Sequence, residues 1–141
     1  METVCDVYPQ AAEVQARQIL LSLPEEAAQP AMEREDGEKL YLCNGYELRV
    51  QTLPSGNLTG TLRTVTGFTE DEMTVIQTMD GENTRYDCVW CTAGETGDQV
   101  GRTAVIDDGS YYYCVSVLAD SAEAGKLRQT WQTLLDSFFV A

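Results

Sequence analysis

The sequence predicts an α+β domain, in which an antiparallel sheet of about six strands carries helices on both faces and a long helix ends the chain. Three observations lead to this prediction. The stretch from Val100 to Ala141 reads as a β-hairpin that feeds directly into one amphipathic helix. Asn44-Gly45 separates two apolar runs, and Asp80-Gly81 separates another pair of alternating runs. Because short hairpins join antiparallel strands, we expect the whole sheet to be antiparallel.

The terminal hairpin alternates on both of its strands. Its inward-facing set is Val100, Arg102, Ala104 and Ile106, then Tyr111, Tyr113, Val115 and Val117. The turn between the strands is Asp-Asp-Gly-Ser, which consists of typical turn residues. Alternation with a period of two indicates strands that place one face on the core.

The final helix is predicted over residues 121–138. Its apolar residues fall on one stripe at helical spacing: Leu127, Trp131, Leu134, Leu135 and Phe138. Asp120 as the N-cap, with Glu123 three positions later, resembles a capping box. The closing Phe-Phe-Val cannot face inward as a whole on one helix, so part of it is expected against a strand or in a partner interface.

Asn-Gly is the strongest short hairpin signal, because both residues tolerate a positive φ. The turn at Asn44-Gly45 therefore predicts a hairpin with a defined register. That register places Cys43 opposite Tyr46, and Tyr41 opposite Leu48.

Residues 57–67 fit two structures. As a strand, Leu58 and Leu62 share a face while Val65 takes the other; as a helix, all three line one stripe. We prefer the helix, with Gly67 as its end. A glycine and four threonines within the segment lower its helix propensity.

The middle of the chain predicts another hairpin. Its inward residues before the turn are Met73, Val75 and Met79, and those after it are Tyr86, Cys88 and Trp90. Residues 93–99 are predicted as a glycine-containing loop that leads to the terminal hairpin.

The chain of 141 residues is expected to form a single domain, 1–141, with three parts. Residues 9–23 predict an N-terminal helix, which opens at a proline and ends at another. Residues 24–38 are rich in Glu, Ala and Pro and predict an acidic, flexible connector. Residues 39–141 form the sheet-and-helix core.

The charge disfavours several partners. Twenty-three acidic residues against nine basic ones give a net charge of −14. Such a surface repels phosphate backbones, so we expect no nucleic-acid partner. No run approaches the ~20 apolar residues of a transmembrane helix. The first residues lack the pattern of a signal peptide. The chain is therefore expected either in the cytoplasm or, with a slight preference, outside it after loss of a leader.

The sequence contains no histidine. This removes the commonest general base and metal ligand, and with it the Ser-His-Asp and Cys-His constellations. No loop has the spacing of a calcium-binding EF-hand. We therefore expect no enzymatic activity, no metal and no cofactor.

Cys88 and Cys91 form the one motif that suggests redox chemistry, a C-x-x-C. The alternation around them indicates a strand, in which residues three apart face opposite ways and lie about 10 Å apart. A disulfide needs Cα atoms within about 7 Å. A zinc site would need four thiolates, and the other three cysteines are scattered singly. We therefore interpret the cysteines mainly as core residues.

Arg102 shares the inward face of its strand with apolar residues. It is expected either to pair with a carboxylate at the end of the sheet or to mark a pocket for a small anionic ligand. The run Tyr111, Tyr112 and Tyr113 puts two rings on one face and one on the other. It predicts either an amphipathic strand or an aromatic binding surface.

Three segments resemble known proteins. The ending Trp131–Phe138 (WQTLLDSF) is similar to the terminal helix of the superfamily of the photosystem extrinsic protein PsbP. Residues 66–68 (TGF) and 108–113 (DGSYYY) resemble segments of uncharacterised exported lipoproteins of gut Firmicutes. The resemblance covers roughly residues 38–141, and the predicted helix at 9–23 and its connector depart from it. It implies an antiparallel sheet between helices, and it carries over no catalytic residue.

Three functions follow as hypotheses. The first is a non-catalytic interaction or accessory domain, of which the soluble part of an exported bacterial lipoprotein is one form. The second is a domain that binds a small anionic ligand near Arg102 and the strand Tyr111–Tyr113. The third is a thiol redox protein that uses Cys88 and Cys91.

Overall fold

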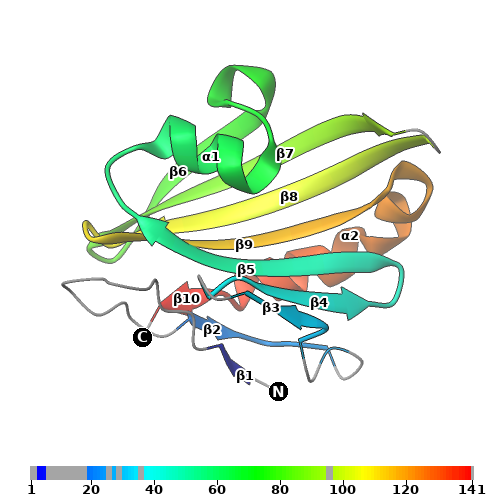
Figure 1. The fold of residues 1–141 in the computed structure, drawn as a ribbon, viewed down its shortest axis with the longest axis horizontal. Helices are drawn as coiled ribbons and strands as arrows, with labels where there is room; N and C mark the ends of the chain where they lie inside the picture. The colour runs from blue at the N-terminus through cyan, green and yellow to red at the C-terminus, as the bar shows by residue number, and fades with distance from the viewer. Residues whose placement is uncertain are drawn as a thin grey trace.

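The computed structural model describes residues 3–5, 19–24, 27, 30–34, 37–94 and 97–140 (Figure 1). The elements in chain order are β1 (Thr3–Cys5), β2 (Ile19–Leu21), β3 (Met32–Glu33), β4 (Lys39–Cys43), β5 (Tyr46–Pro54), α1 (Leu58–Thr66), the 3-10 turn η2 (Glu70–Glu72), β6 (Thr74–Asp80), β7 (Asn83–Gly94), β8 (Gly97–Asp107), β9 (Tyr111–Asp120), α2 (Ser121–Asp136) and β10 (Phe139–Val140).

The fold is built on a seven-stranded sheet in the order β3-β4-β5-β9-β8-β7-β6, and every pairing in it is antiparallel. A second sheet joins β1, β2 and β10. The predicted α+β class is therefore confirmed, with seven strands in the main sheet where about six were expected.

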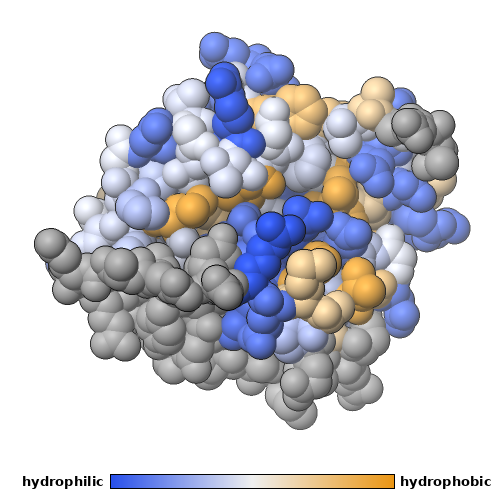
Figure 2. Space-filling view, viewed as in Figure 1, coloured by the Kyte–Doolittle hydropathy of each residue, from blue (hydrophilic) through white to orange (hydrophobic). Residues whose placement is uncertain are grey.

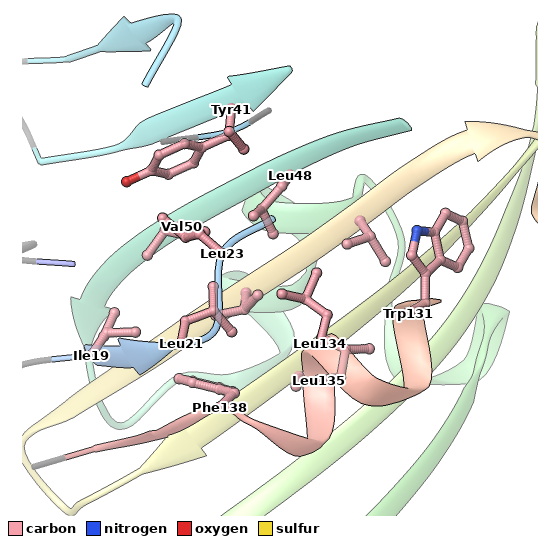
Figure 3. Packing of buried hydrophobic residues seen from close by; sticks show 14 of the residues in the cluster. Ile19, Leu21, Leu23, Tyr41, Leu48, Val50, Trp131, Leu134, Leu135 and Phe138 are labelled. Carbon is pink, nitrogen blue, oxygen red and sulfur yellow. The ribbon is translucent and has the colours of Figure 1, made fainter. Parts of the chain in front are cut away.

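The two faces of the main sheet carry separate cores. On β9, Tyr113, Val115 and Val117 face α2, while Tyr112 and Cys114 face α1. This is the period-two alternation of a strand covered on both sides. The core on the α2 face gathers side chains from β2, β5 and α2; Figure 3 shows Leu21, Leu48, Val50 and Leu134 pointing toward one another. The smaller core on the α1 face consists of Leu62, Cys88, Trp90, Val105, Tyr112 and Cys114.

The local predictions for the first hairpin and for α1 are confirmed. Cys43 pairs with Tyr46 and Tyr41 with Leu48. Residues Leu58–Thr66 form a helix, whose first turn is capped by the Asn57 side chain, and it ends at Gly67 with φ 86°. Many helices end at a residue with left-handed backbone angles, and this residue is usually glycine because glycine adopts these angles without a steric penalty.

The long helix lies where the sequence places it, but its predicted capping box does not form. Asp120 is the N-cap residue of α2 and makes no side-chain capping hydrogen bond. Glu123 instead pairs with Lys126, with Oε1 and Nζ 3.7 Å apart. The chain then turns, and Phe139–Val140 pair with β2. Part of the closing Phe-Phe-Val thus lies against a strand, which was one of the two expectations for it.

The N-terminal segment differs from the prediction. Ile19–Leu21 form a strand between β1 and β10, whereas a helix was predicted over 9–23; residues 9–18 lie outside the described residues. Ile19 and Leu21 are both fully buried while Leu20 between them is partly exposed, which is strand periodicity. Its partner strands come from the two ends of the chain, so the local pattern could not reveal them.

Two further segments are more ordered than predicted. Within 24–38, Ala27 is buried in the core and Met32–Glu33 pair with β4, where the sequence predicted a flexible connector. Within 93–99, β7 continues to Gly94 and β8 begins at Gly97, so the predicted loop is largely a long hairpin. In the described part of the chain, no helix is both long and apolar enough to cross a bilayer.

Candidate functional site

Arg102 lies in the middle of β8, on the face that α2 covers. Its backbone pairs with Val89 on one side and Val117 on the other. Its Nη2 donates a hydrogen bond to Oε1 of Gln132 on α2, at 3.3 Å. The partner is therefore a neutral amide, where a carboxylate was one of the two expectations. Gln132 is held in turn by donating from Nε2 to Asp136, at 2.9 Å.

A hollow of about 500 Å³ opens beside Arg102, between α2 and strands β7 and β8; we call it the α2 groove. Its polar walls include Arg102, Arg128 and Gln132, and its apolar walls include Val89 and Trp131. Arg128 and Gln132 are one helical turn apart, so they project from the same side of α2. The groove thus places two guanidinium groups along one surface.

These two arginines differ from most of the described cations of this chain. Five other cations have carboxylate partners within 4 Å: Arg34, Lys39, Arg49, Arg85 and Lys126. For Arg102 and Arg128, and for the exposed Arg63 of α1, no carboxylate partner is found among the described residues. The groove is therefore a locally cationic surface on a protein of net charge −14.

Trp131 adds an unused donor to this region. Its side chain is 2% exposed, and its Nε1–H is buried without a hydrogen-bond partner in the part of the chain that the structure describes. Buried indole N–H groups normally have an acceptor, because leaving one unpaired costs about 1–3 kcal/mol. Because the nitrogen itself is buried, a ligand in the groove does not reach it while the indole keeps this position.

The three tyrosines are not brought together with Arg102. Tyr111, Tyr112 and Tyr113 are all at most 5% exposed, so they are core residues and present no aromatic surface. The Tyr113 hydroxyl donates to Oδ2 of Asp108 at 2.8 Å. Tyr113 pairs with Ile106, four residues along β8 from Arg102, which corresponds to about 13 Å.

Cys88 and Cys91 lie on β7, as the strand interpretation predicts, and point to opposite faces of the sheet. Cys88 is buried in the core under α1, whereas Cys91 is exposed. Burial, with smaller contributions from Asp87 and Glu70, raises the pKa of the Cys88 thiol to about 12. The thiol therefore stays protonated at neutral pH, and the geometry does not form a redox pair.

Sequence reasoning identified Arg102 but missed Arg128 and Gln132. Their spacing along the final helix was visible, but which strand residue they would meet depends on how α2 docks. No group of three or more Cys, Asp or Glu side chains suited to a metal ion occurs among the residues described.

No known protein-family model matches the sequence, and neither does any curated protein. Solved structures do match. Cyanobacterial PsbP (CyanoP) from Synechocystis aligns with a TM-score of 0.59 and 14% identity over 99% of this chain and 92% of its own. The fold is Mog1/PsbP-like.

Three other solved structures also match. LpqN, involved in cell envelope biogenesis of Mycobacterium tuberculosis, aligns with a TM-score of 0.57 and 10% identity over 100% of this chain and 91% of its own. The Saccharomyces cerevisiae Ran-binding protein Mog1p gives 0.54 and 13%, over 86% and 89%. A Bacteroides thetaiotaomicron protein gives 0.55 and 9% over 87% of this chain, which spans only 45% of its length.

The predicted PsbP-like fold is thus confirmed, and the likeness extends beyond residues 38–141. CyanoP and LpqN align over 99% and 100% of this chain, a larger share than residues 38–141 make up. At these identities the likeness shows the fold alone.

Proposed function

We propose that this chain is a non-catalytic accessory domain that binds a small anionic molecule in the α2 groove. The observation that carries the proposal is the placement of Arg102 and Arg128 along one hollow without carboxylate partners among the described residues. Guanidinium groups bind carboxylates and phosphates strongly, because their planar donors match both geometries.

The location of this charge supports the proposal. The chain carries an excess of acidic residues, so a cationic surface that stays unpaired is not explained by overall composition. The two guanidinium groups along the groove favour a ligand with several acceptor oxygens.

An accessory role is supported by the structural neighbours. Mog1p is a Ran-binding protein, and LpqN is involved in cell envelope biogenesis. We carry over from Mog1p only binding as the general activity. The likeness to LpqN, with the resemblance to exported lipoproteins, also favours the soluble part of an exported lipoprotein. Protease treatment of intact cells, followed by immunodetection, tests that location.

The ligand proposal is tested by thermal unfolding at fixed ionic strength, with inorganic phosphate and citrate as probes. We expect at least one probe to raise Tm; at a concentration of 100 Kd the stabilisation is about 2.7 kcal/mol. Arg102→Gln and Arg128→Gln should each remove most of this shift.

Arg63→Gln is the matched control, because Arg63 is an exposed arginine on α1, outside the groove. It should keep the full shift. Equal shifts in Arg102→Gln and Arg63→Gln, or no shift with either probe, would contradict anion binding in the α2 groove.

A further inference from the structure

A second hollow, of about 350 Å³, lies on the opposite face of the sheet, between the C-terminal end of α1 and strands β5, β7 and β9; we call it the α1 cleft. Figure 2 shows that hydrophobic surface lies between α1 and β5 on this face, next to the hydrophilic surface of β5. The volume is at the low end of the range for small-molecule sites, about 300–1,000 Å³. A molecule the size of an amino acid therefore fits it.

The floor of the cleft is built by one row of residues across the sheet. Trp90 pairs with Gly101, Gly101 with Leu118, and Leu118 with Glu47. A Cβ at Gly101 would overlap the six-membered ring of Trp90, so the glycine is what allows the indole to lie on the sheet. Trp90 is 6% exposed, and Phe68 after α1 contacts it with ring centroids 6.0 Å apart.

The neighbouring row supplies a hydroxyl group with a proton to donate. Trp90 Nε1–H donates to Thr103 Oγ1 at 3.1 Å, and Thr103 Oγ1 lies 2.9 Å from Ser116 Oγ. Thr103 is 1% exposed, and no other acceptor for its proton is found among the described residues. Thr103 therefore donates to Ser116. The hydroxyl of Ser116, itself 5% exposed, is left as a donor in the wall of the cleft.

The rim carries one positive and one negative charge. Arg49 pairs with Ser116 across the strands, and Glu47 lies two residues before it on the same face. Arg49 Nη2 and Glu47 Oε2 are 3.6 Å apart, with the two side chains 45% and 41% exposed. An exposed ion pair of this kind contributes only about 0–1 kcal/mol, so a ligand can replace it at little cost.

These features select the charge of the ligand. The rim is neutral overall and lacks the local excess of cations that the α2 groove has, so here the net charge of −14 disfavours a ligand that is itself an anion. A molecule that carries both an anion and a cation matches Arg49 and Glu47 at once and has no net charge to be repelled. The floor of Trp90 and Leu118 favours a ligand whose remaining part is apolar, and an aromatic ring can stack on the indole.

We propose that the α1 cleft binds a free aromatic amino acid. Its carboxylate contacts Arg49 and accepts the hydroxyl proton of Ser116, its ammonium group contacts Glu47, and its ring lies on Trp90 and Leu118. This site is independent of the α2 groove, which lies on the other face of the sheet.

The test is a titration of the whole chain with L-phenylalanine, followed by ¹H–¹⁵N NMR. The protein has two tryptophans, so its two indole N–H signals report separately on the two faces. We expect a saturable shift of the Trp90 indole and of the Gly67 amide, with the Trp131 indole unmoved. Arg49→Gln should weaken binding about tenfold, because a charged hydrogen bond is lost. Arg63→Gln, matched in chemistry and outside the cleft, should bind like the wild type.

Three analogues separate the contacts. N-acetyl-L-phenylalanine lacks the ammonium group, L-phenylalaninamide lacks the carboxylate, and L-alanine lacks the ring; each should bind at least several-fold more weakly. Glu47→Gln should weaken L-phenylalanine but not its N-acetyl derivative.

Four outcomes would overturn the proposal: no saturable shift, equal affinity in Arg49→Gln, equal affinity for the N-acetyl derivative, or a shift confined to Trp131. Arg102→Gln should leave phenylalanine binding unchanged. Failure in the α1 cleft is thereby distinguished from failure in the α2 groove.

Discussion

At the scale of single residues, Gly101 allows the indole of Trp90 to lie on the α1 face of the sheet. It is buried in the middle of β8, where glycine normally weakens a strand. The pairing of Gly101 with Trp90 explains it, because any side chain there would displace the indole. Trp90 was predicted to face inward and is buried, but its need for a glycine follows from the strand register and not from the local sequence.

Gly101→Ala should therefore destabilise the protein. The added Cβ meets the six-membered ring of Trp90, and the indole must tilt out of its position and strain its hydrogen bond to Thr103. Overpacking of this kind costs about 1–3 kcal/mol. Urea unfolding measures the loss in the free energy of unfolding.

Gly125→Ala is the matched control for that substitution. Gly125 lies within α2, and an added Cβ there meets nothing within 4 Å. Replacing a helix-interior glycine with alanine should stabilise by about 0.5–1 kcal/mol. If both substitutions changed the free energy of unfolding with the same sign, the effect of Gly101→Ala would not come from overlap between the added Cβ and Trp90.

The candidate site shows how far single residues can be interpreted from sequence. Arg102 stood out because a cation shares an inward face with apolar residues, and it does line a groove. The tyrosines were offered as a possible surface, yet both faces of their strand are covered, so all three are buried. Arg128 carried no such signal, because a basic residue on an amphipathic helix is ordinary until the docking of the helix is known.

At the scale of elements, Arg85 of β7 fixes the end of α2. Its Nη2 donates to the Leu135 carbonyl at 2.8 Å and its Nη1 to the Phe138 carbonyl at 3.2 Å. Its Nε lies 3.1 Å from Oδ2 of Asp87, and its guanidinium lies 5.7 Å from the centre of the Phe138 ring. A cation is favourable here because the last carbonyls of a helix carry partial negative charge.

Arg85→Met should lower the free energy of unfolding by about 2 kcal/mol, because the carbonyls of Leu135 and Phe138 and the carboxylate of Asp87 each lose a charged donor. Asp87 is partly exposed, so water compensates some of its loss. Arg85→Lys keeps the charge but not the planar donors, so it should lose less. Arg63→Met, at an exposed position, should stay within about 0.5 kcal/mol of the wild type. Urea midpoints for the three variants check this order, and a loss in Arg63→Met as large as in Arg85→Met would refute it.

Elements were predictable where their signals are local. The first hairpin and its register follow from Asn44-Gly45, and α1 follows from a stripe that ends at a glycine. The segment 19–23 misled because Ile19 and Leu23 also fit a helical stripe. Its strand partners lie at the two ends of the chain, and such non-local pairing leaves no mark on local periodicity.

At the scale of the whole molecule, one sheet separates two cores, and each candidate site lies on one of its faces. The α2 face holds the larger core, which includes side chains from β2 near the start of the chain and from α2 near its end. Among the residues that the structure describes, the α1 face is covered by a nine-residue helix and the segment after it. The short cover leaves room for the α1 cleft, whereas the long helix makes the larger contribution to stability.

Deleting residues 128–141 should therefore unfold the domain. The deletion removes four buried apolar side chains: Trp131, Leu134, Leu135 and Phe138. Burial of each is worth about 1.5–3 kcal/mol, about 6–12 kcal/mol together, against a typical net stability of 5–15 kcal/mol. It also removes β10, one of the two partners of β2.

Near-ultraviolet circular dichroism and a thermal melt measure the outcome. Leu135→Ala should lower the free energy of unfolding by about 2–5 kcal/mol, so this variant should stay folded with a Tm below that of the wild type. A truncated chain that melts cooperatively near the full-length temperature would show that α2 is not what stabilises the sheet.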